Sequence, residues 1–170
     1  MARPTATFVA GAFASVLSLL PVAADAGADD VAQIKAVEDQ FAAAVNAKDV
    51  DAIMKVYVPS ENLFLFDALP PRQYVGAAAV RKDWEDFLAT TKGPLKLTVT
   101  NVACDADVSL GYCRSIQEYT GTDTKGKPFD VTVRQTDVDR KVDGRWLIVH
   151  QHISFPVDLA TGKPDFTSKP

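Results

Sequence analysis

Apolar residues recur at steps of three and four positions through the first half of the chain, beyond residue 26. This spacing predicts an amphipathic helix, which Asp29 or Asp30 can cap at its N-terminus. A second, short helix is expected after Asp49 and ends at Pro59. A third helix is indicated around Trp84. The apolar residues of the three helices are Val31, Ile34, Val37, Phe41, Val45, Ile53, Met54, Tyr57, Val80, Trp84, Phe87 and Leu88.

The hydrophobic period changes to two after Pro94, where apolar and polar residues begin to alternate. A short apolar strand at 63–66 and a proline-containing loop at 67–76 precede the third helix. Helices followed by consecutive strands are typical of an α+β fold, in which N-terminal helices pack on a curved antiparallel sheet. The long strands that the alternation predicts are residues 95–103, 108–119, 129–142 and 145–155.

The first 26 residues have the pattern of a secretory signal peptide. Arg3 precedes an apolar run at residues 8–20, Pro21 follows the run, and small residues then provide cleavage sites. The run has thirteen residues, fewer than the roughly 20 that span a bilayer, which argues against a membrane anchor. We therefore expect a secreted or periplasmic protein whose mature chain begins near Gly27.

The rest of the chain has the length and composition of one domain. Of the 170 residues, 47% are hydrophobic and 24% are charged, which suffices for a core. The formal net charge is −4, so a general nucleic-acid or anionic-membrane binder is excluded, because no basic surplus exists to neutralise phosphates. We expect one domain at 27–156 and an irregular tail at 157–170, with no cofactor and no membrane partner once the leader is removed.

The dipeptide Asp143–Gly144 predicts a two-residue hairpin turn, because both residues tolerate the positive φ angles of a type I′ turn. Such a turn fixes the register of the strands that it joins. Side chains alternate along a strand, so the polar residues paired in this register share one face with Trp146. A polar cluster in the middle of long strands predicts either a lined cavity or a subunit interface. The expected pairs are His150 with Asp137, His152 with Gln135, and Ser154 with Val133.

The two histidines, His150 and His152, allow three interpretations. With Asp137 they offer three metal ligands on one face, but no fourth ligand is indicated, so we expect no metal site. Imidazole groups titrate near neutral pH, and Asp137 could fix a tautomer, which would suit proton transfer. Alternatively, both histidines are structural and line a cavity wall, satisfied by cross-strand polar groups.

Five other residues each allow two interpretations. Asp67, after the short strand, can act as a general base at a pocket mouth or cap the loop through backbone N–H groups. Arg114 and Arg134 lie in strands where an unpaired charge is costly, so they either pair with acidic neighbours or bind an anionic ligand. Trp84 and Phe87 complete a helical stripe and are expected in the core rather than in a ligand cage.

The two cysteines, Cys104 and Cys113, flank an acidic turn at residues 105–107. In a tight hairpin there, Cys113 would lie opposite Thr100 or Asn101, so the cysteines would be ~10 Å or more apart. That separation exceeds the ~7 Å limit between the Cα atoms of a disulfide. We expect no intramolecular bridge, although an oxidising compartment favours one.

Residues 134–154 with Pro156 resemble the closing hairpin of the NTF2-like superfamily, in its SnoaL-like branch. The His-x-His-x-Ser ending after Asp-Gly-Arg-Trp is also similar to the association domain of calcium/calmodulin-dependent kinase II. The helical half matches at residues 45–51, at Tyr57, at 76–80 and at Trp84. This resemblance implies a cone-shaped α+β barrel with a pocket between helices and sheet, usually dimeric through the sheet.

The ketosteroid isomerases of this superfamily can be compared residue by residue. Asp67 stands where the family's general-base aspartate follows its first strand, and Asp137 lies near the position of one oxyanion stabiliser. Phe41 stands where the other stabiliser, a tyrosine, would be, so its hydroxyl is absent and steroid isomerase activity is not expected. In the kinase association domain arginines line the pocket; Arg114 matches one of them, whereas Ile153 stands at the position of another.

Fold alone does not settle function, and three functions stay open. The favoured one is a pocket that binds a small hydrophobic or acidic molecule, since this requires only a few polar anchors. An isomerase-, cyclase- or dehydratase-like enzyme would use Asp67 as general base with His150 or His152, and a homo-oligomeric assembly module would need no pocket. We also expect a homodimer, because a long antiparallel sheet exposes one face unless a partner covers it. The expected ligand contacts are Tyr57, Trp84, Arg114, Gln135, Asp137 and Ser154.

Overall fold

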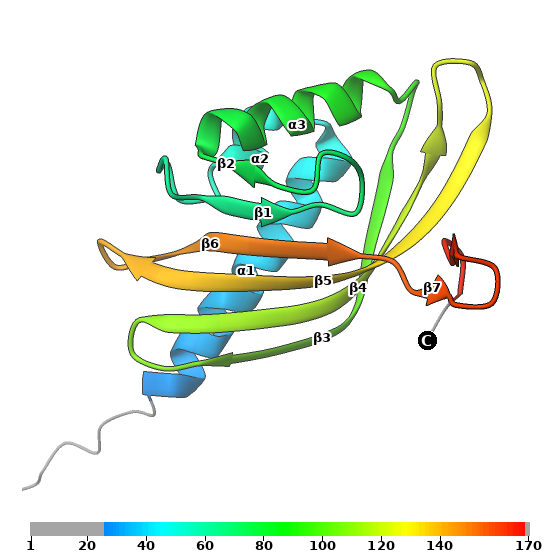
Figure 1. The fold of residues 1–170 in the computed structure, drawn as a ribbon. Coiled ribbons are helices and arrows are strands. Elements are labelled where there is room, and N and C mark those ends of the chain that lie inside the picture. Colours follow the sequence, from blue (N-terminus) through cyan, green and yellow to red (C-terminus); the bar gives the residue numbers. More distant parts are fainter. Residues whose placement is uncertain (1–25, 169–170) are drawn as a thin grey trace, which may run out of the picture.

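The computed structural model describes residues 26–168 of the chain. Three helices lie in this range, as expected: α1 (Ala26–Ala47), α2 (Val50–Met54) and α3 (Ala77–Ala89) (Figure 1). The predicted signal peptide, residues 1–26, lies outside the described residues except for its last one, and it stays a prediction. Among the helices of the described range, none is long and apolar enough to cross a bilayer.

Six strands form one curved sheet against these helices (Figure 1). They are β1 (Phe64–Phe66), β2 (Tyr74–Val75), β3 (Lys96–Ala106), β4 (Leu110–Thr122), β5 (Pro128–Val142) and β6 (Arg145–Ser154). Their spatial order is β2-β1-β6-β5-β4-β3. The four long strands pair antiparallel in sequence order, whereas β1 runs parallel to β6, so the sheet is mixed. The predicted α+β class is confirmed, although β2 lies in the segment that was expected to be a loop.

Helix α1 packs across one face of the sheet and is fastened to it near both ends (Figure 1). Near its start, Asp30 accepts hydrogen bonds from Lys141 Nζ at 2.6 Å and from Trp146 Nε1 at 3.0 Å. Near its end, the Asn46 side chain accepts from the backbone N–H of Leu97 at 2.6 Å and donates to its carbonyl at 3.2 Å. The helix begins before Asp30, so this residue anchors the helix to the hairpin instead of capping it.

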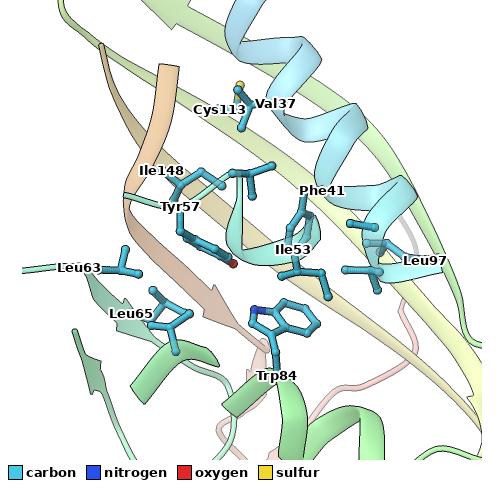
Figure 2. Packing of buried hydrophobic residues seen from close by; sticks show 14 of the residues in the cluster. Val37, Phe41, Ile53, Tyr57, Leu63, Leu65, Trp84, Leu97, Cys113 and Ile148 are labelled. Atoms are coloured by element: carbon cyan, nitrogen blue, oxygen red, sulfur yellow. The ribbon is translucent and has the colours of Figure 1, made fainter. Parts of the chain in front are cut away.

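Aromatic and aliphatic side chains pack between the helices and the inner face of the sheet, the face toward α1 (Figure 2). Phe41 contacts Trp84 edge to face at 5.4 Å between ring centroids, and Tyr57 at 6.3 Å. Phe87 continues the row at 5.9 Å from Trp84. Such pairs contribute about 0.5–1.5 kcal/mol beyond the burial of their area. The core packing expected for Trp84 and Phe87 is confirmed.

The hairpin between β5 and β6 starts in the predicted register and then shifts. Asp143 and Gly144 have φ angles of 49° and 78°, as a type I′ turn requires. The pairing is as predicted as far as Asp139, which lies opposite Ile148. A β-bulge follows, with Val149 as the additional residue on β6, and each later residue of this strand changes face.

The bulge overturns the pairs that were expected beyond it. His150 was expected opposite Asp137, His152 opposite Gln135, and Ser154 opposite Val133; all three expectations are wrong. The observed pairs are Val138 with His150, Asp137 with Gln151, Thr136 with His152, and Arg134 with Ser154. The inner face therefore receives Gln151 where a histidine was expected.

Cys104 and Cys113 form a disulfide, with 4.2 Å between their Cα atoms. The prediction of no bridge is wrong, because the turn lies at residues 107–109 and not at 105–107. This later turn places the two cysteines directly opposite each other on β3 and β4. The bridge joins the two strands close to the turn.

The tail is partly ordered, in contrast to the irregular segment that was expected. Strands β7 (Val157–Asp158) and β8 (Lys163–Pro164) form a small sheet of their own. Phe166 lies 4.7 Å from Phe155 between ring centroids, and its carbonyl accepts a hydrogen bond from the backbone N–H of Thr132 at 2.7 Å. These contacts hold the tail against the end of the large sheet.

Candidate functional site

Asp137 lies at the centre of a group of buried polar side chains on the inner face of the sheet. It is 1% exposed and accepts hydrogen bonds from Gln135 Nε2 at 2.7 Å and from Gln151 Nε2 at 2.8 Å. Oε1 of Gln151 in turn accepts the Tyr57 hydroxyl at 3.0 Å. Three of the predicted ligand contacts, Tyr57, Gln135 and Asp137, are therefore brought together here, with Gln151 supplied by the bulge.

Trp84 borders this group on the side of α3. Figure 2 shows its indole nitrogen directed toward the hydroxyl of Tyr57, but the two groups do not form a hydrogen bond of regular geometry. Burial, reinforced by the charge of Asp137, raises the pKa of Tyr57 well above its usual value. The Tyr57 hydroxyl is therefore neutral throughout the physiological range.

Glu38 projects from α1 into the same buried region and is 3% exposed. Burial, together with the nearby charge of Asp137, raises the pKa of Glu38 to about 10. Asp137 is the better place for a negative charge, because two glutamine amides also donate to it. At neutral pH the pair therefore shares one proton, which Glu38 holds and donates to Asp137. No other donor reaches the Glu38 oxygens.

Asp139 lies two residues beyond Asp137 on the same face of β5 and is 0% exposed. Neither of its carboxyl oxygens has a hydrogen-bond partner. Burial, reinforced by the charge of Asp137, raises the pKa of Asp139 to about 7. A buried polar group without a partner is rare and destabilising, and therefore calls for an explanation beyond packing. We call the following six residues the inner-face network: Glu38, Tyr57, Gln135, Asp137, Asp139 and Gln151.

A row of polar side chains on β4 borders the inner-face network. Tyr119 donates to Gln117 Oε1 at 2.8 Å, and Gln117 Nε2 donates to Ser115 Oγ at 3.3 Å. Burial raises the pKa of Tyr119 well above its usual value, and the charges of Asp137 and Asp67 raise it as well. The Tyr119 hydroxyl thus lies within electrostatic range of both carboxylates.

Asp67, the predicted general base, follows β1 as expected and is half-buried. Its Oδ1 accepts the backbone N–H of Ala68 at 2.6 Å, which agrees with the capping interpretation. Burial nevertheless raises its pKa, which agrees with a proton acceptor. Nearby Asp83 has its pKa raised by burial to about 6, although a hydrogen bond from Tyr74 opposes the shift. The geometry is compatible with both interpretations of Asp67.

His150 and His152 lie on the outer face of the sheet, away from the inner-face network. His150 Nδ1 donates to the Phe64 carbonyl at 2.9 Å, and its ring stacks on Phe64 at 5.8 Å between centroids. His152 is exposed and contacts Phe66 at 5.5 Å. The expected joint action of the histidines with Asp137 is therefore wrong. Within residues 26–168, no group of three or more His, Cys, Asp or Glu side chains is placed to hold a metal ion.

Arg114 and Ser154, the remaining predicted ligand contacts, also lie on the outer face. Arg114 is exposed and lies opposite Thr136 on β5. Ser154 lies opposite Arg134, whose guanidinium donates to the Phe155 carbonyl at 3.1 Å. Neither residue can contribute to a site on the inner face, so the interior lacks the cationic anchor that an acidic ligand was expected to use.

Sequence reasoning missed Glu38, Asp139 and Gln151. A signal for Glu38 was available, because it stands four residues after Ile34 and three before Phe41, within the apolar stripe of α1. Asp139 continues the alternation of inner-face polar residues on β5. Gln151 had no such signal, since its face depends on the bulge at Val149.

The inner face holds acceptors that no donor reaches, above all the two oxygens of Asp139. Each glutamine amide and tyrosine hydroxyl described above already donates one hydrogen bond within the protein, and the Trp84 indole N–H makes no regular hydrogen bond. Stabilisation of an oxyanion requires donors directed at the developing charge. The arrangement therefore suits a molecule that brings donors of its own better than it suits oxyanion chemistry.

A hollow of about 550 Å³ lies elsewhere, beside the turn that joins β3 to β4. It contains none of the predicted site residues and none of the inner-face network. Its lining residues are Asp105, Ala106, Asp107, Leu110, Gly111, Tyr112, Thr136 and Val138.

Solved structures of other proteins share this arrangement of helices packed on a curved sheet. No curated protein matches the chain. An NTF2-like protein of unknown function from Pseudomonas putida KT2440 is 24% identical, with 84% of this chain and 98% of that chain covered and a TM-score of 0.75. A candidate calcium/calmodulin-dependent protein kinase II association domain from Xanthomonas campestris is 26% identical, over 71% of this chain and 84% of that chain, with a TM-score of 0.62. A ketosteroid isomerase-like protein from Erwinia carotovora atroseptica SCRI1043 is 19% identical, over 74% and 95%, with a TM-score of 0.64.

The family model of the SnoaL-like domain matches residues 34–158, from the middle of α1 to β7. The matched range includes every member of the inner-face network. Together with the helices packed on a curved sheet, this match shows that the chain belongs to the SnoaL-like domain family and has an NTF2-like fold.

Proposed function

We propose that this SnoaL-like domain binds a small molecule between its helices and the inner face of its sheet. The observation that carries the proposal is the inner-face network, in which a buried carboxyl group, Asp139, has no hydrogen-bond partner. Apolar walls with a few convergent polar groups are typical of small-molecule sites. Phe41 and Trp84 supply such walls next to the network.

Binding accounts for the interior better than oxyanion-type catalysis does. Phe41 provides no hydroxyl at the position where the isomerase relatives use a tyrosine, and the hydroxyl of Tyr57 already donates to Gln151. Removal of one oxyanion donor commonly costs about 3 kcal/mol of transition-state stabilisation. A binding site has no such requirement.

The proposal places the protein outside the cytoplasm, as a secreted or periplasmic domain. The leader pattern of residues 1–26 supports export. The disulfide between Cys104 and Cys113 supports it independently, because such bonds persist in oxidising compartments and are rare in the cytosol. N-terminal sequencing of the exported protein should recover a chain that begins near Gly27, and recovery of Met1 would contradict this part of the proposal.

We also propose that two copies pair through the outer face of the sheet. Three large side chains on this side are well exposed, with Phe66 at 39%, Tyr112 at 45% and Leu110 at 48%. Light scattering at micromolar concentration should give the mass of a dimer, and Phe66→Arg should shift it toward the monomer. A monomeric wild-type protein would contradict the pairing.

The binding function can be tested by a thermal-shift screen of small molecules. The affinities of the compounds found are then measured on two variants. Trp84→Phe alters the wall of the interior, whereas His152→Ala alters an exposed side chain on the outer face. Compounds that bind inside should lose at least tenfold in affinity with Trp84→Phe and keep it with His152→Ala. A screen without any binder, or equal effects of the two variants, would contradict the proposal and favour an assembly module.

A second candidate, isomerase-, cyclase- or dehydratase-like proton transfer, is favoured by one observation, the raised pKa of half-buried Asp67. A binder identified in the screen should then be converted to product, and Asp67→Asn should abolish turnover while binding remains. If no binder is converted, Asp67 caps the loop after β1 and the binding function stands alone.

A further inference from the structure

We infer that the molecule bound at the inner-face network carries a positively charged amine, or a similar N–H donor group, which is accepted by the oxygens of Asp139, Glu38 and Gln135. This inference rests on the proposed binding function and names the chemical class of its ligand. It departs from the sequence-based expectation of a hydrophobic or acidic molecule.

The first observation is a set of buried oxygens without donors. Asp139 is 0% exposed, Gln135 is 2% exposed and Glu38 is 3% exposed. Both carboxyl oxygens of Asp139 and the amide oxygen of Gln135 lack a hydrogen-bond partner, and no donor reaches the Glu38 oxygens. Even when Glu38 donates its proton to Asp137, the Asp139 carboxyl stays unpartnered. An amine with several N–H groups can serve acceptors grouped in this way.

The second observation concerns charge. Three acidic side chains lie close together, because the charge of Asp137 raises the pKa values of both Glu38 and Asp139. Among the described residues, no lysine, arginine or histidine forms an ion pair with any of the three. Lys141, the cation on the same face of β5, is held by Asp30 at 2.6 Å. A buried charge is strongly destabilising unless it is paired, so a cationic ligand relieves the repulsion and an anionic one increases it.

The third observation limits what the cation can be. No group of three or more metal-ligating side chains is placed for a metal ion in the described part of the chain, which favours an organic cation. Tyr57 is linked to Asp137 through Gln151, and its ring contacts Phe41 edge to face, as Phe41 does Trp84. The ligand class is therefore an amine attached to a small aromatic or aliphatic body.

The test uses three probes that share a benzyl or phenyl ring and differ in the head group: benzylamine, benzyl alcohol and benzoate. Dissociation constants are measured by calorimetric titration at pH 7.5 on the wild type, on Asp139→Asn and on Asp39→Asn. Asp39 is exposed and neighbours Glu38, so its substitution removes the same charge outside the network. We expect benzylamine to bind at least tenfold more tightly than benzyl alcohol, and benzoate to bind most weakly. Asp139→Asn should weaken benzylamine at least tenfold, and Asp39→Asn by less than twofold.

Two results would overturn the inference. One is benzyl alcohol or benzoate binding as tightly as benzylamine; the other is Asp139→Asn binding benzylamine as the wild type does. Absence of binding by all three probes would overturn it too. Its failure is distinct from that of the proposed function, because neutral or acidic hits in the wider screen that are sensitive to Trp84→Phe would leave the binding site in place and change only the ligand class.

Discussion

The unpartnered carboxyl of Asp139 should make the stability of the protein depend on pH in a way that one substitution removes. Burial raises the pKa of Asp139 from 3.8 to about 7. Between these values the folded protein holds a proton that the unfolded chain has released. The folded state therefore binds more protons in this window, and the free energy of unfolding falls as the pH rises from about 4 to about 7.

The size of the effect follows from the displacement of the pKa. About three pH units at about 1.4 kcal/mol per unit amount to about 4 kcal/mol, which is fully present below pH 4 and lost by about pH 7. Asp139→Asn has the same shape and carries no titrating group. The difference in unfolding free energy between the variant and the wild type should therefore grow by about 4 kcal/mol, in favour of the variant, between pH 4 and pH 8.

Urea unfolding followed by tryptophan fluorescence, at half-unit steps from pH 4 to pH 8, measures this difference. Asp39→Asn, an exposed substitution of the same kind, serves as the control and should run parallel to the wild type at every pH. A constant difference between Asp139→Asn and the wild type across the range would refute the reasoning. It would mean that water or a hydrogen bond reaches the Asp139 carboxyl in solution.

Three further predictions use the same unfolding assay. Replacing Cys104 and Cys113 together by serine should cost about 3 kcal/mol, because the bridge closes a loop with a sequence separation of nine; wild type in reducing agent should show the same loss, and an unchanged midpoint would argue against the bond. Tyr57→Phe should cost about 1–2 kcal/mol, since Gln151 Oε1 loses its donor in a buried place; a neutral result would show that Gln151 is hydrated. Trp84→Ala should cost about 3–5 kcal/mol through the cavity that it leaves, and a loss below 1 kcal/mol would show that its ring is not packed as described.

The fold was largely predictable because its signals are local. The spacing of apolar residues marks the helices, and the alternation after Pro94 marks the four long strands. The Asp143–Gly144 turn fixes its hairpin as far as Asp139, since the turn type depends on two residues alone. Where pairing depends on a shift inside a strand, as at Val149, the sequence offers no comparable signal. Ile148, Val149 and His150 follow one another without the alternation that would show which residue is the additional one.

The misplaced residues of β6 follow from that single residue. Asp137 and Gln135 were placed on the correct face, and Trp84 joins them because its helix was correctly predicted. Tyr57 was expected in a helix that reaches Pro59, but α2 ends at Met54 and Tyr57 lies beyond it, in a β-bridge with Ile148. The prediction put His150 and His152 on the inner face, where the structure has Gln151, since one extra residue moves every later side chain of a strand to the other face. Glu38 was overlooked for a different reason: a single acidic residue in an apolar stripe gains meaning only when its neighbours on the sheet are known.

The parallel pairing of β1 with β6 has a consequence for the order in which the molecule opens and closes. Strands β3 to β6 join their neighbours through short turns, whereas Phe64 and His150, in contact across β1 and β6, are separated by 86 residues. Closing so long a loop loses more conformational entropy than forming a hairpin does. We therefore expect the four-stranded part to form first, and β1 with the segment that carries Asp67 to dock late.

The same segment should also be the first to detach in the folded state, because local opening follows the least supported elements. β1 has three residues and β2 has two, so few backbone hydrogen bonds must break. Such an opening would uncover the interior from the side of α3 while the long strands stay paired. A small molecule could thus reach the buried acids, and leave them, without unfolding of the sheet.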